Sequence, residues 1–436
     1  MRTVFVLFAV FVSVSAHATM TLEFWHSMSG AKGELLKKLV ETFNREPQNV
    51  GVREVKLQYA GTYIEGLNKL RSSLMAHRGP HIAQIFDIGT QVMVDSGATT
   101  PLEDFSANDP EFPNAELLPQ IRSYYELKGK LQALPFATSN PILFYNADLF
   151  KRAGIAAPPK TFLELAAMSR KLTDKPNHIF GMTWPLHSWF FEEWLARQGV
   201  TFVDRENGRN GNAITANFTT PEALAIVRLW DGLVKEGSFA NVGRGWDPAQ
   251  QNFLAARAAM FITSTSEVFE IFRRAPFAVG TGPIPTQDPK RAGGTVLGGN
   301  ALWILKEKPL EEQRAAYAFL KFMASKAAQR TWHTGTGYFP IRHDLIAELK
   351  KEGFYEKNPG AWTAIEQLRA SPEIPATRGA VIGVFPEVRE HLESALESVL
   401  ANVATPEAAL AKAKTKSEAA LVRYHRLREA AARIPH

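Results

Sequence analysis

The amino-acid sequence predicts an α/β protein with two lobes joined by three short crossings. Strand-like and helix-like patterns alternate through the first hundred residues, stop at a short polar segment near 137–140, and then begin again. Two later glycine-containing segments, at 277–283 and 335–340, indicate further crossings. The chain has 436 residues, which is enough for two large domains. Three short connections between two lobes are typical of a hinge.

The first lobe begins with three strands, and a helix follows each of them. Apolar runs predict strands at 21–25, 52–59 and 82–86, and helical spacing predicts helices around 35–43, at 64–76 and from 89 onward. This order is typical of a largely parallel sheet. Ligands of such sheets bind beyond the carboxyl ends of the strands, where this chain has Trp25-His26-Ser27, Tyr63 and Asp87.

A polar pivot at 137–140 separates two apolar runs, 131–136 and 142–145. Pro135 and Pro141 flank the pivot and oppose a helix there. An ordinary strand–turn–strand explains this stretch, taken alone, as well as a crossing does. The later crossings favour a passage between lobes, with the end of the pivot at a ligand cleft.

After the pivot, the pattern of helices and strands begins again. We expect helices at 147–153, 162–172, 221–235, 248–257, 310–324, 384–400 and 406–431, and strands at 179–183, 259–262 and 301–305. The predicted lobe I comprises 19–136 and 281–338, and the predicted lobe II comprises 139–279 and 340–436.

The N-terminal segment has the pattern of a signal peptide. Arg2 precedes an apolar run at 4–14, and Ala16-His17-Ala18 predicts cleavage after Ala18. The chain has no cysteine, which excludes disulfides, thiolate metal sites and a lipidated cysteine. We therefore expect a free periplasmic protein. The net charge of +6 is too small to indicate a nucleic-acid partner.

No catalytic or metal-binding motif stands out. The sequence has neither a G-x-S-x-G nucleophile elbow nor a Walker phosphate loop. His77 and His81 have the spacing of metal ligands on a helix, but Arg78-Gly79-Pro80 between them opposes a helix. The pair Glu192-Glu193 is interpreted as a solvated helix face. We predict no enzyme, no metal site and no cofactor.

Polar and aromatic residues gather instead at the predicted strand ends and crossings. They are Tyr63, Asp87, Ser139, Ser264, Thr265 and Tyr338, together with the tryptophans Trp184, Trp189 and Trp194. Each residue alone is explained by capping or by core packing. As a set they suit a cleft for a small polyol, because aromatic faces cover C–H surface, polar groups hold hydroxyls, and helix N-termini receive an anion.

Several motifs resemble those of the periplasmic sn-glycerol-3-phosphate-binding proteins of ABC importers, which belong to the maltose- and oligosaccharide-binding group. The shared pieces are at 24–28, 61–63, 140–146, 242–244, 298–303, 336–341 and 353–361, and the likeness covers almost all of 20–428. The resemblance implies a type II periplasmic binding protein, with two α/β lobes around a ligand cleft and a three-segment hinge.

The resemblance also implies a set of ligand-binding residues. They are Tyr63, Asp87, Ser139, Trp184, Trp189, either Ser264 or Thr265, either Gly298 or Gly299, Tyr338, and Arg389 as the phosphate-binding arginine. The best-known members have glutamate where this chain has Asp87. The shorter side chain leaves more room, which favours a glycerophosphodiester such as glycerophosphocholine beside the monoester.

The function implied by the resemblance is capture of sn-glycerol-3-phosphate, or of such a diester, for import. Its partners would be the permease and ATPase subunits of an ABC importer, and the protein would act as a monomer that closes around its ligand. One alternative is a binding protein for a neutral oligosaccharide, which needs aromatic platforms but no phosphate-binding arginine. Another is a secreted phosphodiesterase, which needs a metal or a nucleophile–base pair.

Overall fold

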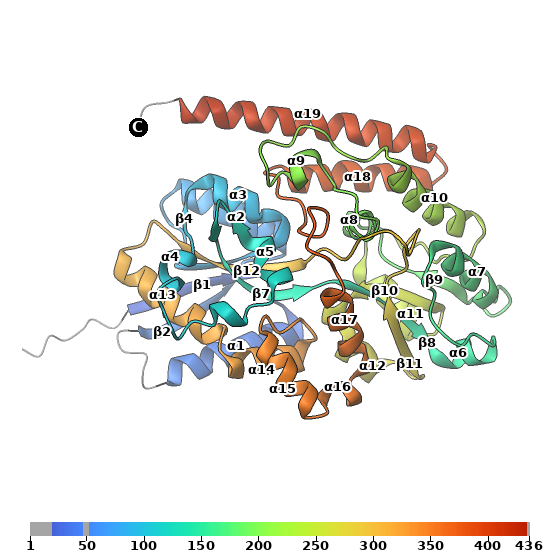
Figure 1. Ribbon diagram of the computed structural model, residues 1–436, viewed down its shortest axis with the longest axis horizontal. Helices are drawn as coiled ribbons and strands as arrows, with labels where there is room; N and C mark the ends of the chain where they lie inside the picture. Colours follow the sequence, from blue (N-terminus) through green and yellow to red (C-terminus); the bar gives the residue numbers. More distant parts are fainter. Residues whose placement is uncertain (1–19, 47–51, 434–436) are drawn as a thin grey trace, which may run out of the picture.

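The computed structural model describes residues 20–46 and 52–433, which form two lobes side by side (Figure 1). One sheet has the order β2-β1-β3-β12-β4, with β7 also paired to β12, and the other has the order β11-β8-β10-β9. The strands are β1 (Met20–His26), β2 (Val52–Tyr59), β3 (Ile82–Phe86), β4 (Thr99–Thr100), β5 (Glu126–Leu127), β6 (Lys130–Leu131), β7 (Leu134–Ser139), β8 (Pro141–Asn146), β9 (Phe180–Thr183), β10 (Ala258–Ser264), β11 (Val279–Pro283) and β12 (Gly298–Leu305). The predicted signal peptide lies outside the described residues.

Helices cover both sheets. They are α1 (Gly30–Arg45), α2 (Tyr63–Met75), α3 (Thr90–Ser96), α4 (Glu103–Ser106), α5 (Pro119–Tyr125), α6 (Ala147–Arg152), α7 (Phe162–Leu172), α8 (Ser188–Arg197), α9 (Asp204–Asn207), α10 (Pro221–Lys235), α11 (Trp246–Leu254), α12 (Val268–Arg274), α13 (Leu310–Met323), α14 (Lys326–Thr336), α15 (His343–Lys351), α16 (Phe354–Lys357), α17 (Pro359–Arg369), α18 (Phe385–Leu400) and α19 (Pro406–Ala432), with short 3-10 turns η1 (Asp87–Gly89), η2 (Asn114–Glu116) and η3 (Thr265–Glu267).

The sheet of lobe I is parallel only in part. β1 pairs in parallel with β2 and β3, as the alternating pattern predicts. β12 arrives from far along the chain and runs antiparallel to β3, and β7 runs antiparallel to β12. The strand β3 is buried along its whole length, so its run of apolar residues reflects cover on both faces. The strand and helix order of this lobe was therefore predictable, whereas the mixed sheet was not.

The carboxyl ends of β1 and β3 point toward the other lobe. A helix cap and a 3-10 turn at this edge position polar side chains. Thr62 accepts a hydrogen bond from the backbone of Glu65, and Glu65 accepts one from the backbone of Thr62, which forms a capping box at the start of α2. This cap fixes Tyr63 as the first residue of the helix. Asp87 directly follows β3 and begins η1.

The first crossing is shorter than the sequence predicts. β7 continues through Ser139, because Thr138 and Ser139 pair with Gly299 and Gly298 of β12. β8 begins at Pro141, so the chain passes from one sheet to the other at Asn140 alone. The predicted polar turn at 137–140 is wrong, because pairing with a strand about 160 residues away extends β7 across it.

The second crossing lies later in the chain than predicted. Thr281 pairs with Phe144 and Pro283 pairs with Ile142, so β11 belongs to the sheet of lobe II. Residues 281–283, which the sequence assigned to lobe I, are therefore part of lobe II. The third segment follows α14, where Gly337 has a φ of 89° and the Phe339 N–H donates to the Thr138 carbonyl. Ser139, which the sequence assigned to lobe II, pairs with Gly298 in the sheet of lobe I, and the remaining lobe boundaries stay a prediction.

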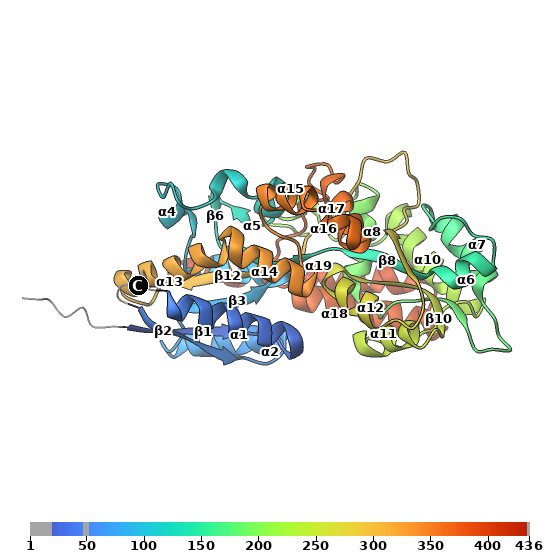
Figure 2. The same cartoon turned by 90° about the horizontal axis from the view of Figure 1, so that it is seen from below.

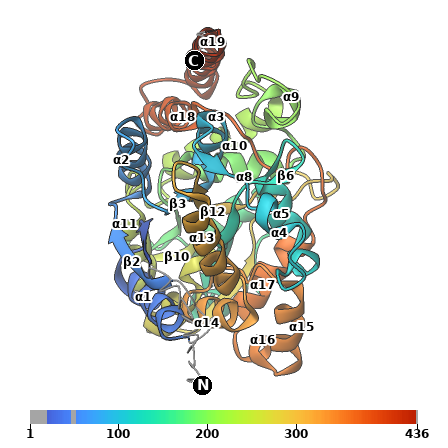
Figure 3. The ribbon, with the colours of Figure 1, turned by 90° about the vertical axis from the view of Figure 1, so that its left-hand side faces the viewer.

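The C-terminal helices α18 and α19 run along one side of the molecule (Figures 1 and 3). In the view from below, α11 and α12 of lobe II face α1 and α2 of lobe I (Figure 2). The Tyr424 hydroxyl of α19 donates to Asp95 of α3 at 2.7 Å, and Arg428 pairs with the same carboxylate at 2.8 Å. The C-terminal helix thus contacts lobe I. Within the described part of the chain, no helix is long and apolar enough to cross a membrane.

Gly299 occupies a backbone position that other residues cannot adopt without strain. Its φ is 109°, and a Cβ atom there would lie 1.8 Å from the Ala137 carbonyl oxygen of β7. The strained backbone alone costs about 1–3 kcal/mol. Because the new Cβ atom would also clash with the Ala137 carbonyl oxygen, we expect Gly299→Ala to lower the free energy of unfolding by more than about 3 kcal/mol. Urea unfolding measures the effect.

Gly97→Ala is the matched control, because Gly97 also has a positive φ, 63°, but open space around it. Its cost should be about 1 kcal/mol. Equal losses for the two variants would contradict the close approach of β7 and β12.

Candidate ligand-binding site

A cavity of about 770 Å³ lies between the lobes. Lobe I contributes the first turns of α1 and α2, the end of β3 and the start of β12. Lobe II contributes parts of α8, α11, η3 and the first turns of α18. Strand ends and helix N-termini therefore meet at one place, as expected for a ligand site in an α/β protein.

The structure brings most of the predicted site residues to this cavity. Those in its wall are Tyr63, Asp87, Ser139, Trp189, Ser264, Gly298, Gly299, Tyr338 and Arg389. Of the two alternatives Ser264 and Thr265, Ser264 lines the cavity and Thr265 does not. Gly298 and Gly299 both line the cavity; Gly298 lies against the Trp189 ring, and Gly299 lies against the Ala137 carbonyl of β7.

Thr265 and Trp184 lie in the protein interior instead. Thr265 is fully buried, and its hydroxyl accepts a hydrogen bond from the Asn140 N–H at 3.4 Å. Trp184 is 1% exposed, and its ring packs edge-on against Trp230 and Phe239 with centroids 5.1 and 4.5 Å away. Trp184 is therefore a core residue of lobe II. Contrary to the prediction that it contacts the ligand, it does not line the cavity.

Two tyrosines define one side of the cavity. The Tyr63 hydroxyl accepts a hydrogen bond from Asn300 at 2.9 Å, and its ring stacks on Phe86 with centroids 5.6 Å apart. Tyr338 stacks on Trp332 with an interplanar angle of 5°. Burial raises the pKa of Tyr338 to about 12 and raises that of Tyr63 well above its ordinary value. Both hydroxyls are therefore neutral. The Tyr63 hydroxyl donates to that of Tyr338, and the Tyr338 hydroxyl can donate to a ligand.

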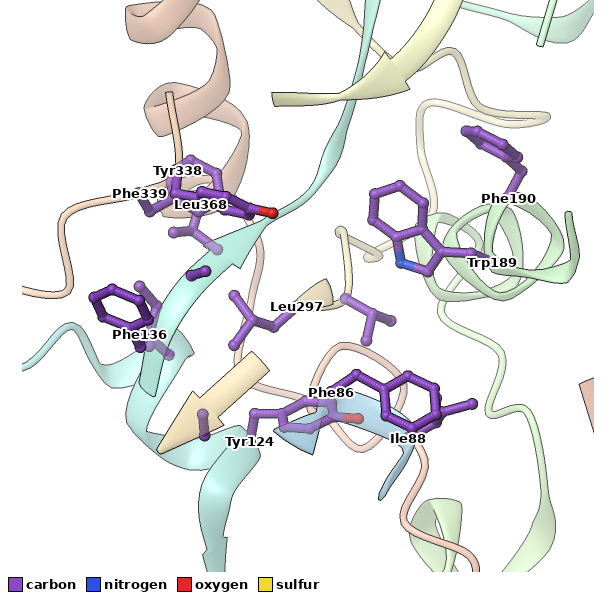
Figure 4. Close-up of a cluster of buried hydrophobic side chains, with 14 of the residues drawn as sticks. Phe86, Ile88, Tyr124, Phe136, Trp189, Phe190, Leu297, Tyr338, Phe339 and Leu368 are labelled. Carbon is purple, nitrogen blue, oxygen red and sulfur yellow. The ribbon is translucent and has the colours of Figure 1, made fainter. Parts of the chain in front are cut away.

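Aromatic rings from lobe II form the opposite side. Trp189 of α8 and Trp246 of α11 have ring centroids 6.0 Å apart. Figure 4 shows Trp189 facing Tyr338 across the cavity, with Phe86 and Ile88 along a third side. The buried indole Nε1 of Trp189 has no hydrogen-bond partner within the described residues. Gly298 makes room for this ring, because a Cβ atom there would lie 2.8 Å from Trp189 Cζ2.

Arg389 belongs to a buried cluster of charged side chains. Its Nε and Nη2 donate to the two carboxylate oxygens of Glu192 at 2.8 and 2.9 Å. Its Nη2 also lies 3.7 Å from an Asp87 oxygen across the lobe boundary. All three residues are less than 10% exposed. The interpretation of Glu192-Glu193 as a solvated helix face is wrong, because both side chains are buried.

Burial and the neighbouring charges shift the pKa values of all three residues in this cluster. Burial raises the pKa of Glu192 to about 7, although Arg389 beside it opposes the shift. Burial likewise raises the pKa of Asp87. Burial alone would lower the pKa of Arg389, but Glu192 and Asp87 hold it above its ordinary value. The guanidinium is therefore fixed as a cation between two acids.

A second set of ion pairs lies at the mouth of the cavity, and no sequence pattern predicted it. Lys32 of α1 pairs with Glu267 of η3 at 2.5 Å and donates to Ser266 at 3.2 Å, which links lobe I to lobe II. At the rim, Arg244 pairs with Glu390 at 2.7 Å. No local pattern identifies such partners. The buried Glu192 did have a signal, since the segment SWFFEEWLAR is apolar on every side of its helix.

No group of three or more potential metal-ligating side chains suited to an ion occurs among the described residues. Buried tyrosine hydroxyls, a serine-bearing strand end and a single buried guanidinium are suited to holding a polar ligand by hydrogen bonds. Two aromatic walls can cover its apolar surface. The geometry of the cavity is that of a binding protein whose two lobes enclose a small solute.

Comparison with known proteins identifies the class. Residues 38–363 match the profile of the bacterial extracellular solute-binding proteins, and the chain belongs to this family. It is the solute-binding component of an ABC transporter.

Among its relatives is the sn-glycerol-3-phosphate-binding periplasmic protein UgpB of Escherichia coli K12, with 32% identity over 94% of this chain and 95% of that protein. UgpB of Shigella flexneri serotype 5b is also 32% identical, over the same shares of the two chains.

Solved structures confirm the predicted two-lobed fold. UgpB from Mycobacterium tuberculosis, in complex with glycerophosphocholine, superimposes with a TM-score of 0.79 at 22% identity and covers 94% of this chain and 100% of that one. The sugar-binding protein MalE from Xanthomonas citri superimposes with a TM-score of 0.78 at 18% identity and covers 94% and 99%. At these identities the likeness concerns the fold alone.

Proposed function

We propose that this protein captures a phosphate-bearing polyol in the periplasm and delivers it to the permease and ATPase subunits of an ABC importer. The ligand is sn-glycerol-3-phosphate or a glycerophosphodiester such as glycerophosphocholine. The protein acts as a monomer and performs no chemical step. The sn-glycerol-3-phosphate-binding proteins that are 32% identical to this chain support this ligand class.

The observation that carries the proposal is a buried arginine at the cavity. Arg389 lines the cavity one turn into α18, where backbone N–H groups and the helix dipole also favour an anion. Its Nη1 has no hydrogen-bond partner within the described residues, so one edge of the guanidinium is free to bind a phosphate oxygen. A binding site for a neutral sugar gains nothing from keeping this charge in a dehydrated place.

The other wall residues fit the rest of such a ligand. Asp87 accepts hydrogen bonds from the glycerol hydroxyls, and the neutral hydroxyl of Tyr338 donates to an oxygen of the ligand. Trp189 and Trp246 cover the apolar surface of the ligand. Ligand bound to both lobes favours the closed form, which the permease then recognises.

A neutral oligosaccharide is the second candidate, because aromatic faces such as Trp189 and Trp246 also stack on sugar rings. Isothermal titration calorimetry with glycerol-3-phosphate, glycerophosphocholine and maltose separates the candidates. The proposal predicts binding of at least one phosphate ligand and none of maltose. Binding of maltose alone would contradict it.

The absence of a chemical step is tested separately. The protein is incubated with glycerophosphocholine, and the solution is assayed for free choline. The proposal predicts that the diester remains intact. Release of choline at a rate that scales with protein concentration would favour a phosphodiesterase.

A further inference from the structure

The pairing of Arg389 limits what the cavity can offer to a phosphate. A free guanidinium binds a phosphate through two parallel hydrogen bonds. Here the edge formed by Nε and Nη2 is already taken by both oxygens of Glu192. The edge formed by Nη1 and Nη2 remains for the ligand, but the positive charge behind it is shared with Glu192 and with Asp87, whose oxygen lies 3.7 Å from Nη2.

The charged groups in the cavity wall strengthen this point. Its cations are Arg389 and Lys32, and Lys32 is paired with Glu267. Its carboxylates are Asp87, Asp247, Glu267, Glu270, Glu390 and Glu393. Arg244 at the rim pairs with two of these wall carboxylates, Glu390 and Glu393, and with Glu397, so its charge is already balanced. The surroundings of a bound phosphate are therefore not strongly positive.

From this geometry we propose that Glu192 is a specificity-determining residue, which makes the site prefer a monoanionic phosphodiester to a dianionic phosphate monoester. This inference rests on the proposed function and adds the charge of the ligand to it. A diester with one negative charge can be held by the remaining edge of the guanidinium, and the residual charge of Arg389 balances it. The second charge of a monoester would lie uncompensated near Asp87 and Glu192, where like charges repel.

Calorimetry with glycerol-3-phosphate and glycerophosphoglycerol at pH 8 tests the inference, because the two ligands share the glycerol unit and differ in phosphate charge. The wild-type protein should bind the diester more tightly. Glu192→Gln keeps the shape and removes one negative charge, so it should raise the affinity of the monoester relative to the diester by about tenfold. An unchanged ratio would overturn the inference.

Glu193→Gln is the matched control. Glu193 is the neighbouring buried carboxylate, and it accepts a hydrogen bond from the Val296 N–H at 3.0 Å instead of contacting Arg389. This variant should leave the ratio of the two affinities unchanged. An equal shift in both variants would mean that net charge alone sets the preference and would overturn the assigned role of Glu192.

A measurement on the unaltered protein keeps the inference testable if Glu192→Gln does not fold. The charged and titratable groups that face Glu192 are Arg389 and Glu393 of α18, Asp87 of η1, Glu193 of α8 and Tyr124 of α5. A dianion placed among these acids should take up a proton at pH 8. Calorimetry in two buffers that differ in ionisation enthalpy should therefore show more proton uptake for the monoester than for the diester.

The outcomes separate the two proposals. If neither phosphate ligand binds to the wild-type protein, the proposed function fails. If both bind, with equal proton uptake and with a ratio that Glu192→Gln does not change, the proposed function stands and the role of Glu192 fails.

Discussion

Arg389→Ala should weaken the binding of a phosphate ligand by about 2–4 kcal/mol, or roughly thirty- to a thousandfold in Kd. The variant removes a charge-assisted hydrogen bond in a dehydrated cavity. It also leaves Glu192 and Asp87 without their cation, so a bound phosphate would face two unbalanced acids. Calorimetric titration with glycerophosphocholine measures the loss.

The controls for this prediction separate folding from binding. Arg389→Lys keeps the charge but cannot form the bidentate pair, so it should lose less affinity than Arg389→Ala. Loss of one partner of a buried ion pair costs about 3–5 kcal/mol of stability, so circular dichroism must confirm that the alanine variant is folded. The double variant Glu192→Gln with Arg389→Gln removes the strain of the unpaired glutamate. A folded variant that lacks Arg389 and binds as tightly as the wild type would refute the phosphate contact.

Trp184→Ala should lower the free energy of unfolding by about 3–5 kcal/mol, as expected when a fully buried tryptophan leaves a large cavity. Its ring packs against Trp194, Trp230 and Phe239 in lobe II and does not reach the ligand cavity. The affinity of the protein that remains folded should change little. Urea unfolding together with calorimetry measures both quantities.

Trp189→Ala is the matched comparison for Trp184→Ala. Trp189 lines the ligand cavity, so its removal should cost ligand affinity and less stability. If Trp184→Ala left the stability unchanged and weakened the ligand instead, the assignment of Trp184 to the core would be wrong.

The elements that local patterns define were predictable. Apolar alternation and helical spacing predicted β1 through α2 within a few residues, because each element buries one face against its neighbours. The end of β7 was not predictable in this way. Thr138 and Ser139 are polar, and they remain in the strand because β12 pairs with them. That pairing depends on a distant part of the chain and leaves no local signal.

In the candidate site too, some residues could be predicted from the sequence and others could not. Tyr63 and Asp87 could be placed at the cavity because strand ends of one sheet meet at the same edge. Arg389 was expected at the phosphate, but its partner Glu192 comes from another helix, α8. The contact between Lys32 and Glu267 likewise joins two lobes. Such contacts are set by tertiary packing, so they became visible only in the structure.

The most direct test of the account is a crystal structure of the protein grown with glycerophosphocholine. The predicted result is a ligand between the two lobes, with a phosphate oxygen within hydrogen-bond distance of Arg389 Nη1 and with Glu192 still bound to the other edge of the guanidinium. The glycerol hydroxyls should contact Asp87 and the two cavity tyrosines. A ligand outside this cavity, or a phosphate held away from Arg389, would contradict the account.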